Sequence, residues 1–321
     1  MKKWLLIMMN MLVWAGFSMP AQAEQAVPSA MQQAKVYFNG YDISEWKWDQ
    51  QHIVVPLFAF DDYSYFNQDG SKGKQDVTYK WDAAAKTVWV YSADKSRTIK
   101  LIAEQPSAWV NGKKVALDAP VRIIEGHTYV PLRFISEALG GKVKWDAKKK
   151  AAIIRTPERV KRDEIIRTGE LEAARQEALR LPFVYPNREI KPRSEGFEAT
   201  IVFPEGEALR YRYHIKDVTS VVAITEDGLA EVVWQGRTGT SADKLFEEIG
   251  SKPDFGTSMV YFRHSFPVEN FVTYGKMDAQ GRTTELGKFD VMLKLRSNAD
   301  AVISIRGEKR TDARPPQEDR K

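Results

Sequence analysis

The chain has 321 residues, of which 43% are hydrophobic, 11% aromatic and 28% charged, which is typical of globular proteins and predicts two or three domains. The formal net charge is +5, and basic residues are interspersed with acidic ones, so composition does not indicate a nucleic-acid partner. Because there is no cysteine, disulfides and thiol chemistry are excluded, and the folded parts depend on core burial.

Residues 1–23 have the pattern of a secretory signal peptide. Lys2 and Lys3 precede an apolar stretch from Trp4 to Phe17, and Ala21-Gln22-Ala23 is a small-x-small cleavage site. The stretch is shorter than the roughly 20 residues that cross a bilayer, which argues against an uncleaved anchor. No later apolar run is long enough to span a membrane. We therefore expect a secreted protein that has no membrane-spanning segment after cleavage. It could associate loosely with the cell wall.

An internal repeat predicts two related units after a flexible segment of residues 24–34. A degenerate unit over residues 35–105 precedes a clearer one over residues 106–156. The corresponding stretches are Asn39-Gly40 and Asn111-Gly112, Val55-Pro56-Leu57 and Val130-Pro131-Leu132, and Lys80-Trp81-Asp82-Ala83 and Lys144-Trp145-Asp146-Ala147. The equivalent tryptophans, Trp81 and Trp145, are expected in the core.

The clearer unit predicts an α+β fold, an antiparallel sheet wrapped on one helix. Hairpins are expected at Asn111-Gly112 and Glu125-Gly126, and a third between residues 142–146 and 151–155. A helix should begin near Pro131, bury Leu132, Ile135 and Leu139 on one face, and end at Gly140. Each unit is expected to bury its helix against its own sheet.

The first unit carries a polar and aromatic insertion near residues 61–75, where we place the candidate ligand site. Tyr63, Tyr65 and Phe66 would supply stacking area, with Asp61, Asp62 and Asn67 as hydrogen-bonding neighbours. The alternative is that these aromatics only attach the loop to the sheet. Residues 65–76 partly imitate a calcium loop, but Tyr65 takes the place of the first carboxylate and two lysines lie within the loop, so no metal site is predicted.

The rest of the chain predicts a helical connector and a mainly-β domain. Residues 157–195 read as amphipathic helices, with Thr156 as N-cap and Pro157 in the first turn, followed by a proline-rich linker. Residues 196–310 contain about eight strand signals and one helix over residues 242–249, which together favour a β-sandwich-like domain. The tail, residues 311–321, is expected to be disordered.

The quoted motifs of residues 106–156 resemble a known family. Trp109-Val110-Asn111-Gly112, Tyr129-Val130-Pro131-Leu132-Arg133-Phe134 and Val143-Lys144-Trp145-Asp146 resemble the copper amine oxidase N-terminal-like domain, also called the stalk domain. The first unit departs from the pattern, since Phe58 stands where Arg133 does. The resemblance implies a fold and an extracellular setting in secreted or wall-associated bacterial proteins. In the oxidases this domain is an appendage to the catalytic part.

No set of residues converges on catalysis. The four histidines, His52, His127, His214 and His264, do not have the spacing of a copper centre, and no Asn-Tyr-Asp/Glu motif could supply a quinone, so an amine oxidase is excluded. His214 and His264 each lie on an expected strand and could face each other in the sandwich, although two histidines on polar strand faces are more often simply solvated. We therefore expect no cofactor and a non-catalytic binding or scaffolding protein of the cell envelope, whose partner is a wall polymer or another secreted protein. The alternative is an extracellular hydrolase with its active site in the C-terminal β domain.

The signal-peptide pattern makes one testable prediction. N-terminal sequencing of the secreted protein should begin at Glu24, because cleavage follows Ala23. An intact Met1 on membrane-bound protein would contradict this.

Overall fold

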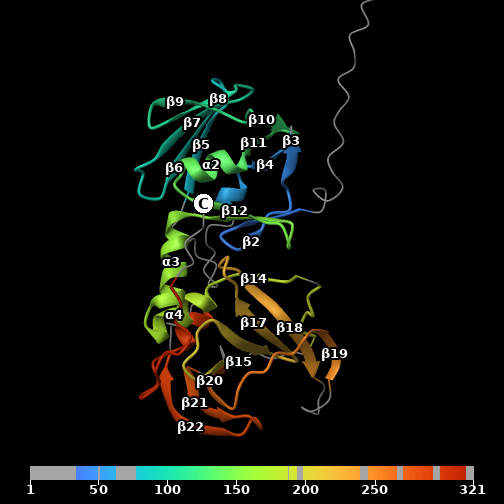
Figure 1. Ribbon diagram of the computed structural model, residues 1–321, viewed down its shortest axis with the longest axis vertical. Coiled ribbons are helices and arrows are strands. Elements are labelled where there is room, and N and C mark those ends of the chain that lie inside the picture. Colours follow the sequence, from blue (N-terminus) through green and yellow to red (C-terminus); the bar gives the residue numbers. More distant parts are fainter. Residues whose placement is uncertain are drawn as a thin grey trace, which may run out of the picture.

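A computed structural model describes residues 34–49, 51–62, 77–186, 188–193, 198–238, 245–265, 270–291 and 297–315. β-strands predominate, as the sequence predicts for most of the chain. Figure 1 shows an N-terminal part at one end of the long axis and a large sheet at the other, with the helix α3 (Pro157–Thr168) running beside the junction. None of the helices in these ranges has the length and apolar character that crossing a membrane requires.

Three small sheets build the N-terminal part. Their orders are β12-β13-β1-β2, β10-β11-β4-β3 and β5-β6-β7-β8-β9. The strands are β1 (Lys35–Phe38), β2 (Tyr41–Asp42), β3 (Lys47–Asp49), β4 (His52–Pro56), β5 (Val77–Asp82), β6 (Thr87–Ser92), β7 (Thr98–Ile102), β8 (Ser107–Val110), β9 (Lys113–Ala116), β10 (Arg122–Ile124), β11 (His127–Pro131), β12 (Lys142–Asp146) and β13 (Ala151–Arg155).

The tight hairpins form where the sequence predicts them. Asn111 and Gly112 have φ values of 49° and 81° between β8 and β9, and Glu125 and Gly126 have 52° and 81° between β10 and β11. Positive φ at both central residues is the property of the type I′ turn, whose twist suits two paired strands. The β12–β13 hairpin is also confirmed.

The helix α2 (Leu132–Ala138) lies close to its expected position. Leu132, Ile135 and Leu139 are buried as predicted, and the chain leaves the helix through Gly140, whose φ is 83° and whose N–H donates to the carbonyl of Glu137. The corresponding helix after β4, α1 (Ala59–Asp62), is a single turn that buries Phe60 edge-on against Phe38, with 5.0 Å between ring centroids.

The prediction of two units with separate sheets is wrong. β4 pairs with β11 in the middle of one sheet, and β1 pairs with β13 in another, so each half completes sheets of the other. One hydrophobic cluster contains Val36 and Val55 from the first half together with Val130 and Ile135 from the second. Pairing across the halves covers strand edges of β4 and β11 that a separate unit would leave unpaired.

The expectation that Trp81 and Trp145 lie in the core is also wrong. Their exposed fractions are 37% and 41%. Trp81 lies on β5 and Trp145 on β12, and each of these is the edge strand of its sheet. An edge strand has a neighbour on one side only, so a large ring at its end is not enclosed.

Two helices connect the N-terminal part to the large sheet. Thr156 caps α3, since its Oγ1 accepts a hydrogen bond from the N–H of Arg159 at 3.2 Å, and Pro157 occupies the first turn, as predicted. The helix α4 (Leu171–Leu179) follows. Ile166, Ala178 and Leu179 join the hydrophobic core of the large sheet. The helices therefore cover one face of that sheet, and are not a free connector.

The C-terminal part is one nine-stranded sheet and not a sandwich of two sheets. Its order is β14-β18-β17-β16-β15-β20-β21-β22, and β19 also pairs with β18. The strands are β14 (Phe183–Val184), β15 (Glu198–Pro204), β16 (Arg210–Ile215), β17 (Val218–Ile224), β18 (Ala230–Thr238), β19 (Leu245–Gly250), β20 (Ser258–Ser265), β21 (Phe271–Asp278) and β22 (Thr283–Asp290). Helices take the place of a second sheet on one face. On the other face Phe255 packs among Val202, Trp234 and Tyr261.

Three local predictions in this part need correction. Residues 245–249 are strand and not helix, because β19 pairs with β18 and its Glu247 forms an ion pair with Arg237. Residues 301–305 carry the last of the predicted strand signals, but Ala301 ends the 3₁₀ helix η1 (Asn298–Ala301) and residues 302–305 are irregular. The proline-rich segment contributes β14, which pairs in parallel with β18.

The expected disorder of the tail does not hold for residues 311–315. The Asp312 carboxylate accepts hydrogen bonds from the N–H groups of Ala208 and Leu209, both at 2.7 Å, and the Arg314 N–H donates to the carbonyl of Arg167 at 2.9 Å. Just upstream, Glu308 forms a bidentate ion pair with Arg175, and these side chains are 2% and 1% exposed. The remainder of the tail, residues 316–321, lies outside the described residues.

A buried arginine holds the two parts of the protein together. Arg159 is 2% exposed, and its Nε donates to Asp163 at 2.8 Å. Its other two nitrogens donate to the backbone carbonyls of Asn39, in the turn after β1, and of Gly228, in the turn before β18. A Cβ on Gly228 would lie 2.9 Å from the Asp163 carboxylate, so only glycine permits this approach.

An apolar contact surrounds this network. Tyr37, Ala151 and Ile153 from the sheet of β1 and β13 pack with Val184 and Leu229 from the large sheet. Beside them, Lys144 pairs with Asp227 and Lys149 with Glu231, both at 2.5 Å. The two parts are therefore joined by a packed interface as well as by the chain.

Replacing the bridging arginine should destabilise the protein strongly. Arg159→Met should lower the free energy of unfolding by about 3–5 kcal/mol, because Asp163 stays buried with a weakened ion pair and two carbonyls lose their donor. Lys161→Met is the control: Lys161 is an exposed residue on the same helix, with a surface ion pair worth about 0–1 kcal/mol. Urea denaturation measures both, and equal midpoints for the two variants would contradict the bridge.

Candidate functional site

The candidate ligand site of the sequence analysis lies mostly outside the described residues. Tyr63, Tyr65, Phe66 and Asn67 belong to residues 63–76, which the structure does not describe. The backbones of Asp61 and Asp62 end α1, and their side chains are outside the description. Recognition through this insertion stays a prediction.

The structure places an aromatic groove elsewhere, where α2 meets two sheets. Its volume is about 320 Å³. Trp48 from β3, Phe134 from α2 and Trp145 from β12 supply aromatic lining, and Ile53 and Val143 add aliphatic surface. A volume of this size is at the lower end of small-molecule sites, which are commonly apolar with a few polar groups. We name it the Trp145 groove.

Both halves of the N-terminal part are needed for this groove. Trp48 and Ile53 come from the first half, whereas Phe134, Val143 and Trp145 come from the second. The register of β4 on β11, with Val55 opposite Val130, brings the two sets together. Trp48 is half-buried, and its ring lies edge-on to that of Trp46, with 5.8 Å between the ring centroids.

Charged and polar side chains lie among the aromatic ones. His52, Asp118, Arg133 and Lys144 all contribute to the lining. The ammonium group of Lys144 is held by Asp227 at 2.5 Å, whereas Arg133 and Asp118 form no hydrogen bond or ion pair with any residue in the described ranges. A guanidinium and a carboxylate are thus available to a ligand beside a stacking surface.

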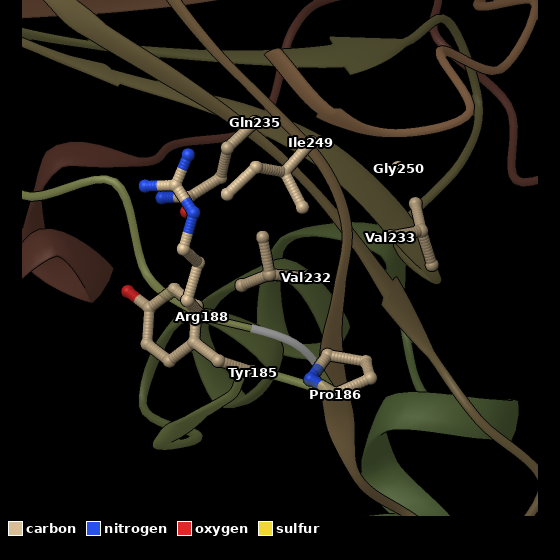
Figure 2. A pocket seen from close by; sticks show the side chains of 8 residues that line it. All are labelled: Tyr185, Pro186, Arg188, Val232, Val233, Gln235, Ile249 and Gly250. Atoms are coloured by element: carbon tan, nitrogen blue, oxygen red, sulfur yellow. The ribbon is translucent and has the colours of Figure 1, made fainter. Parts of the chain in front are cut away.

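Two other hollows have a different character. Figure 2 shows one beside β18 and β19, where Arg188 extends past Tyr185 toward Gln235; its volume is about 10 Å³, room for about one water molecule. A second, of about 270 Å³, lies over β15, β20, β21 and β22 and is lined by charged residues, Glu198, Arg263, Glu285 and Lys288. This second hollow offers ionisable groups of the kind expected of a hydrolase in the C-terminal part.

The two histidines of the large sheet do not face each other. His264 lies opposite Ala199, and His214 lies opposite Thr200. Directly opposed residues share a face of a sheet, whereas neighbours along a strand point to opposite faces. His214 and His264 are therefore on opposite faces. Within the described ranges no group of three or more histidine, aspartate or glutamate residues could hold a metal ion.

Comparison with known proteins identifies one part of the chain. Residues 72–154 match the family model of the copper amine oxidase N-terminal domain. This match begins further upstream than the region of residues 106–156 in which the motifs are clear. It is a single match, so a second copy of the domain in this chain stays a prediction. No match was found among curated proteins or among solved structures.

The matched domain is the non-catalytic part of the oxidase, which agrees with the expectation that this chain is not an amine oxidase. The match spans β5 to β13 and includes Phe134 and Trp145, but not Trp48. Sequence reasoning missed the groove because Trp145 was assigned to the core. A signal of its exposure was present in the sequence, because Trp145 lies between two charged residues, Lys144 and Asp146, near the end of its strand.

The buried histidines predict a pH dependence of stability. Burial lowers the pKa of His264 and of His214 from the usual 6.5. The unfolded chain therefore binds protons near pH 6.5 that the folded protein does not, so stability is complete above this pH and falls as the pH drops below it. Thermal unfolding should show a lower melting temperature at pH 5 than at pH 7.

His264→Gln should reduce this difference in melting temperature, because it removes one buried group that must stay neutral. His127→Gln removes an exposed imidazole and controls for the loss of a histidine as such. If His264→Gln keeps the full difference between pH 7 and pH 5, then His264 does not contribute to the pH dependence.

Proposed function

We propose that the protein is a secreted, non-catalytic binding and scaffolding protein of the bacterial cell envelope. The observation that carries this proposal is the Trp145 groove, which combines a stacking surface with unpaired charges in the region that matches the stalk-like domain. Large exposed aromatic side chains in a groove are typical of ligand contacts. The signal-peptide pattern of residues 1–23 supports an extracellular setting.

The packed interface between the two parts supports a scaffolding role. Arg159, the apolar contact around Tyr37 and the ion pair of Lys144 with Asp227 fix the groove relative to the large sheet. A ligand in the groove would therefore be held at a defined orientation to the C-terminal sheet. A flexible tether would show few such contacts.

We also propose that the N-terminal part is a degenerate repeat with exchanged strands. In the β4–β11 pair, Val55 lies opposite Val130, and Val54 and Pro56 lie opposite Pro131 and Tyr129. In the sequence, Val55-Pro56 corresponds to Val130-Pro131. A two-fold axis between Val55 and Val130 would exchange these equivalent residues, and the observed register is the one that such an axis produces. The outer strands follow the same relation, with β3 beside β4 and β10 beside β11.

One observation keeps a hydrolase as the second candidate. The charged hollow of the large sheet places two exposed carboxylates, Glu198 and Glu285, in the same lining as Arg263 and Lys288. Pairs of carboxylates perform acid–base work in glycoside hydrolysis. This candidate requires turnover, which a binding protein does not show.

Co-sedimentation with an insoluble envelope polymer tests the proposal. The mature protein should sediment with purified peptidoglycan, and Trp145→Ala should reduce the bound fraction because the stacking surface is lost. Trp81→Ala is the matched control, since Trp81 has a similar exposure and the corresponding position in the other hairpin, outside the groove. Secreted proteins from the same culture, immobilised in a parallel arm, test the alternative partner.

Absence of binding in both arms would contradict the proposed function. Release of soluble fragments from the polymer by the wild-type protein, and its loss in the Glu198→Gln and Glu285→Gln variants, would instead favour the hydrolase.

A further inference from the structure

Trp145 presents its indole to the groove and is not enclosed by its own domain. The side chain is 41% exposed and lies on the edge strand β12, opposite the small residue Ala152. Trp81, on β5, is 37% exposed and lies opposite Val88 of β6, but it does not line the groove. An exposed indole in a lining that also contains polar side chains can contact a ligand that has one apolar face and many hydroxyl groups.

Arg133 supplies the second element of recognition. Its side chain is exposed in the lining of the groove and forms no hydrogen bond or ion pair with any described residue. The other cation in the lining, Lys144, is already neutralised by Asp227. A guanidinium can donate two parallel hydrogen bonds to a carboxylate or a phosphate group, which makes it selective for such anions.

Asp118 completes the polar lining. It is exposed and, like Arg133, has no partner among the described residues. A carboxylate accepts hydrogen bonds from hydroxyl groups. An indole face, a hydroxyl acceptor and a guanidinium in one groove correspond to the C–H face, the hydroxyl groups and the acidic substituent of an acidic sugar.

We propose that the Trp145 groove binds a sugar chain that carries anionic groups, with a pyranose ring stacked on Trp145 and an acidic substituent paired with Arg133. This rests on the proposed function and specifies its ligand. An apolar peptide is disfavoured, because its side chains need an enclosed pocket, whereas this groove leaves its main aromatic surface two-fifths exposed. Without Lys2 and Lys3 of the signal peptide, the net charge falls from +5 to +3, which is still of the sign that attracts an anionic polymer.

Titration calorimetry with the mature full-length protein tests this ligand class. Three probes separate the contributions: an oligosaccharide of hexuronic acids, a neutral hexose oligosaccharide of equal length, and the neutral oligosaccharide carrying phosphate groups. A proline-rich peptide is the fourth probe. We expect binding of at least one acidic sugar, binding at least about tenfold weaker to the neutral one, and none to the peptide.

The variants assign the binding to the groove. Trp145→Ala should weaken binding of all sugars, whereas Arg133→Gln should weaken the acidic ones about tenfold and leave the neutral one unchanged. Trp81→Ala and Lys80→Gln, in the corresponding hairpin, are the matched controls and should behave like the wild type. The Arg133 side chain has no hydrogen bond or ion pair with a described residue to lose. Its variant is therefore a test of the groove that does not depend on whether Trp145→Ala folds, and melting temperatures of both variants check their folding.

Equal affinity for acidic and neutral sugars, preference for the peptide, or full acidic-sugar binding in Arg133→Gln would overturn the inference. These outcomes differ from failure of the proposed function. If the protein sediments with envelope polymer but binds no acidic sugar, only the inference fails. If it binds neither the polymer nor secreted proteins, the proposed function fails as well.

Discussion

The pairing of β4 with β11 is the constraint on which the N-terminal part depends. Val55 and Val130 face each other in this pair and are fully buried. Through it, the first half of the domain becomes continuous with the second, and a common core replaces two small ones. Small isolated sheets with one helix bury little of their surface, so a shared core contributes stability that neither half could reach alone. The same pairing brings Trp48 beside Phe134 and Trp145.

The junction with the large sheet uses a polar contact at its centre. Burying Arg159 and Asp163 requires desolvating both charges, which offsets much of their attraction, so the ion pair is weak evidence for net stability. Its hydrogen bonds reach carbonyls in both parts of the protein, in the turns at Asn39 and Gly228. These directional bonds specify one orientation of the two parts, whereas the apolar contact around Tyr37 could accept several.

Local sequence signals predicted local structure well. The Asn111-Gly112 turn, the Thr156 cap and the buried face of α2 each depend on residues within a few positions of one another. The predictions that were wrong depend on distant partners. Residues 245–249 have helical character, but pairing with β18 makes them a strand. Residues 311–315 have a disordered composition, but Asp312 finds donors at Ala208 and Leu209.

The Trp145 groove also could not be predicted from local sequence signals, because residues distant in the sequence form it. The internal repeat suggested that Trp81 and Trp145 are core residues, and only the order of the strands shows that both lie on sheet edges. Trp81 and Trp145 both lie exposed on edge strands, but Trp145 lines the groove together with Arg133, whereas Trp81 does not line it. In the proposed repeat, Phe58 takes the position of Arg133. If the repeat is real, the exchange of Arg133 for Phe58 is one difference that would leave the edge near Trp81 without the cation that the Trp145 groove has. In the proposed function, recognition would depend on the pairing of the two halves as well as on Arg133, because Trp48 and Trp145 come from different halves.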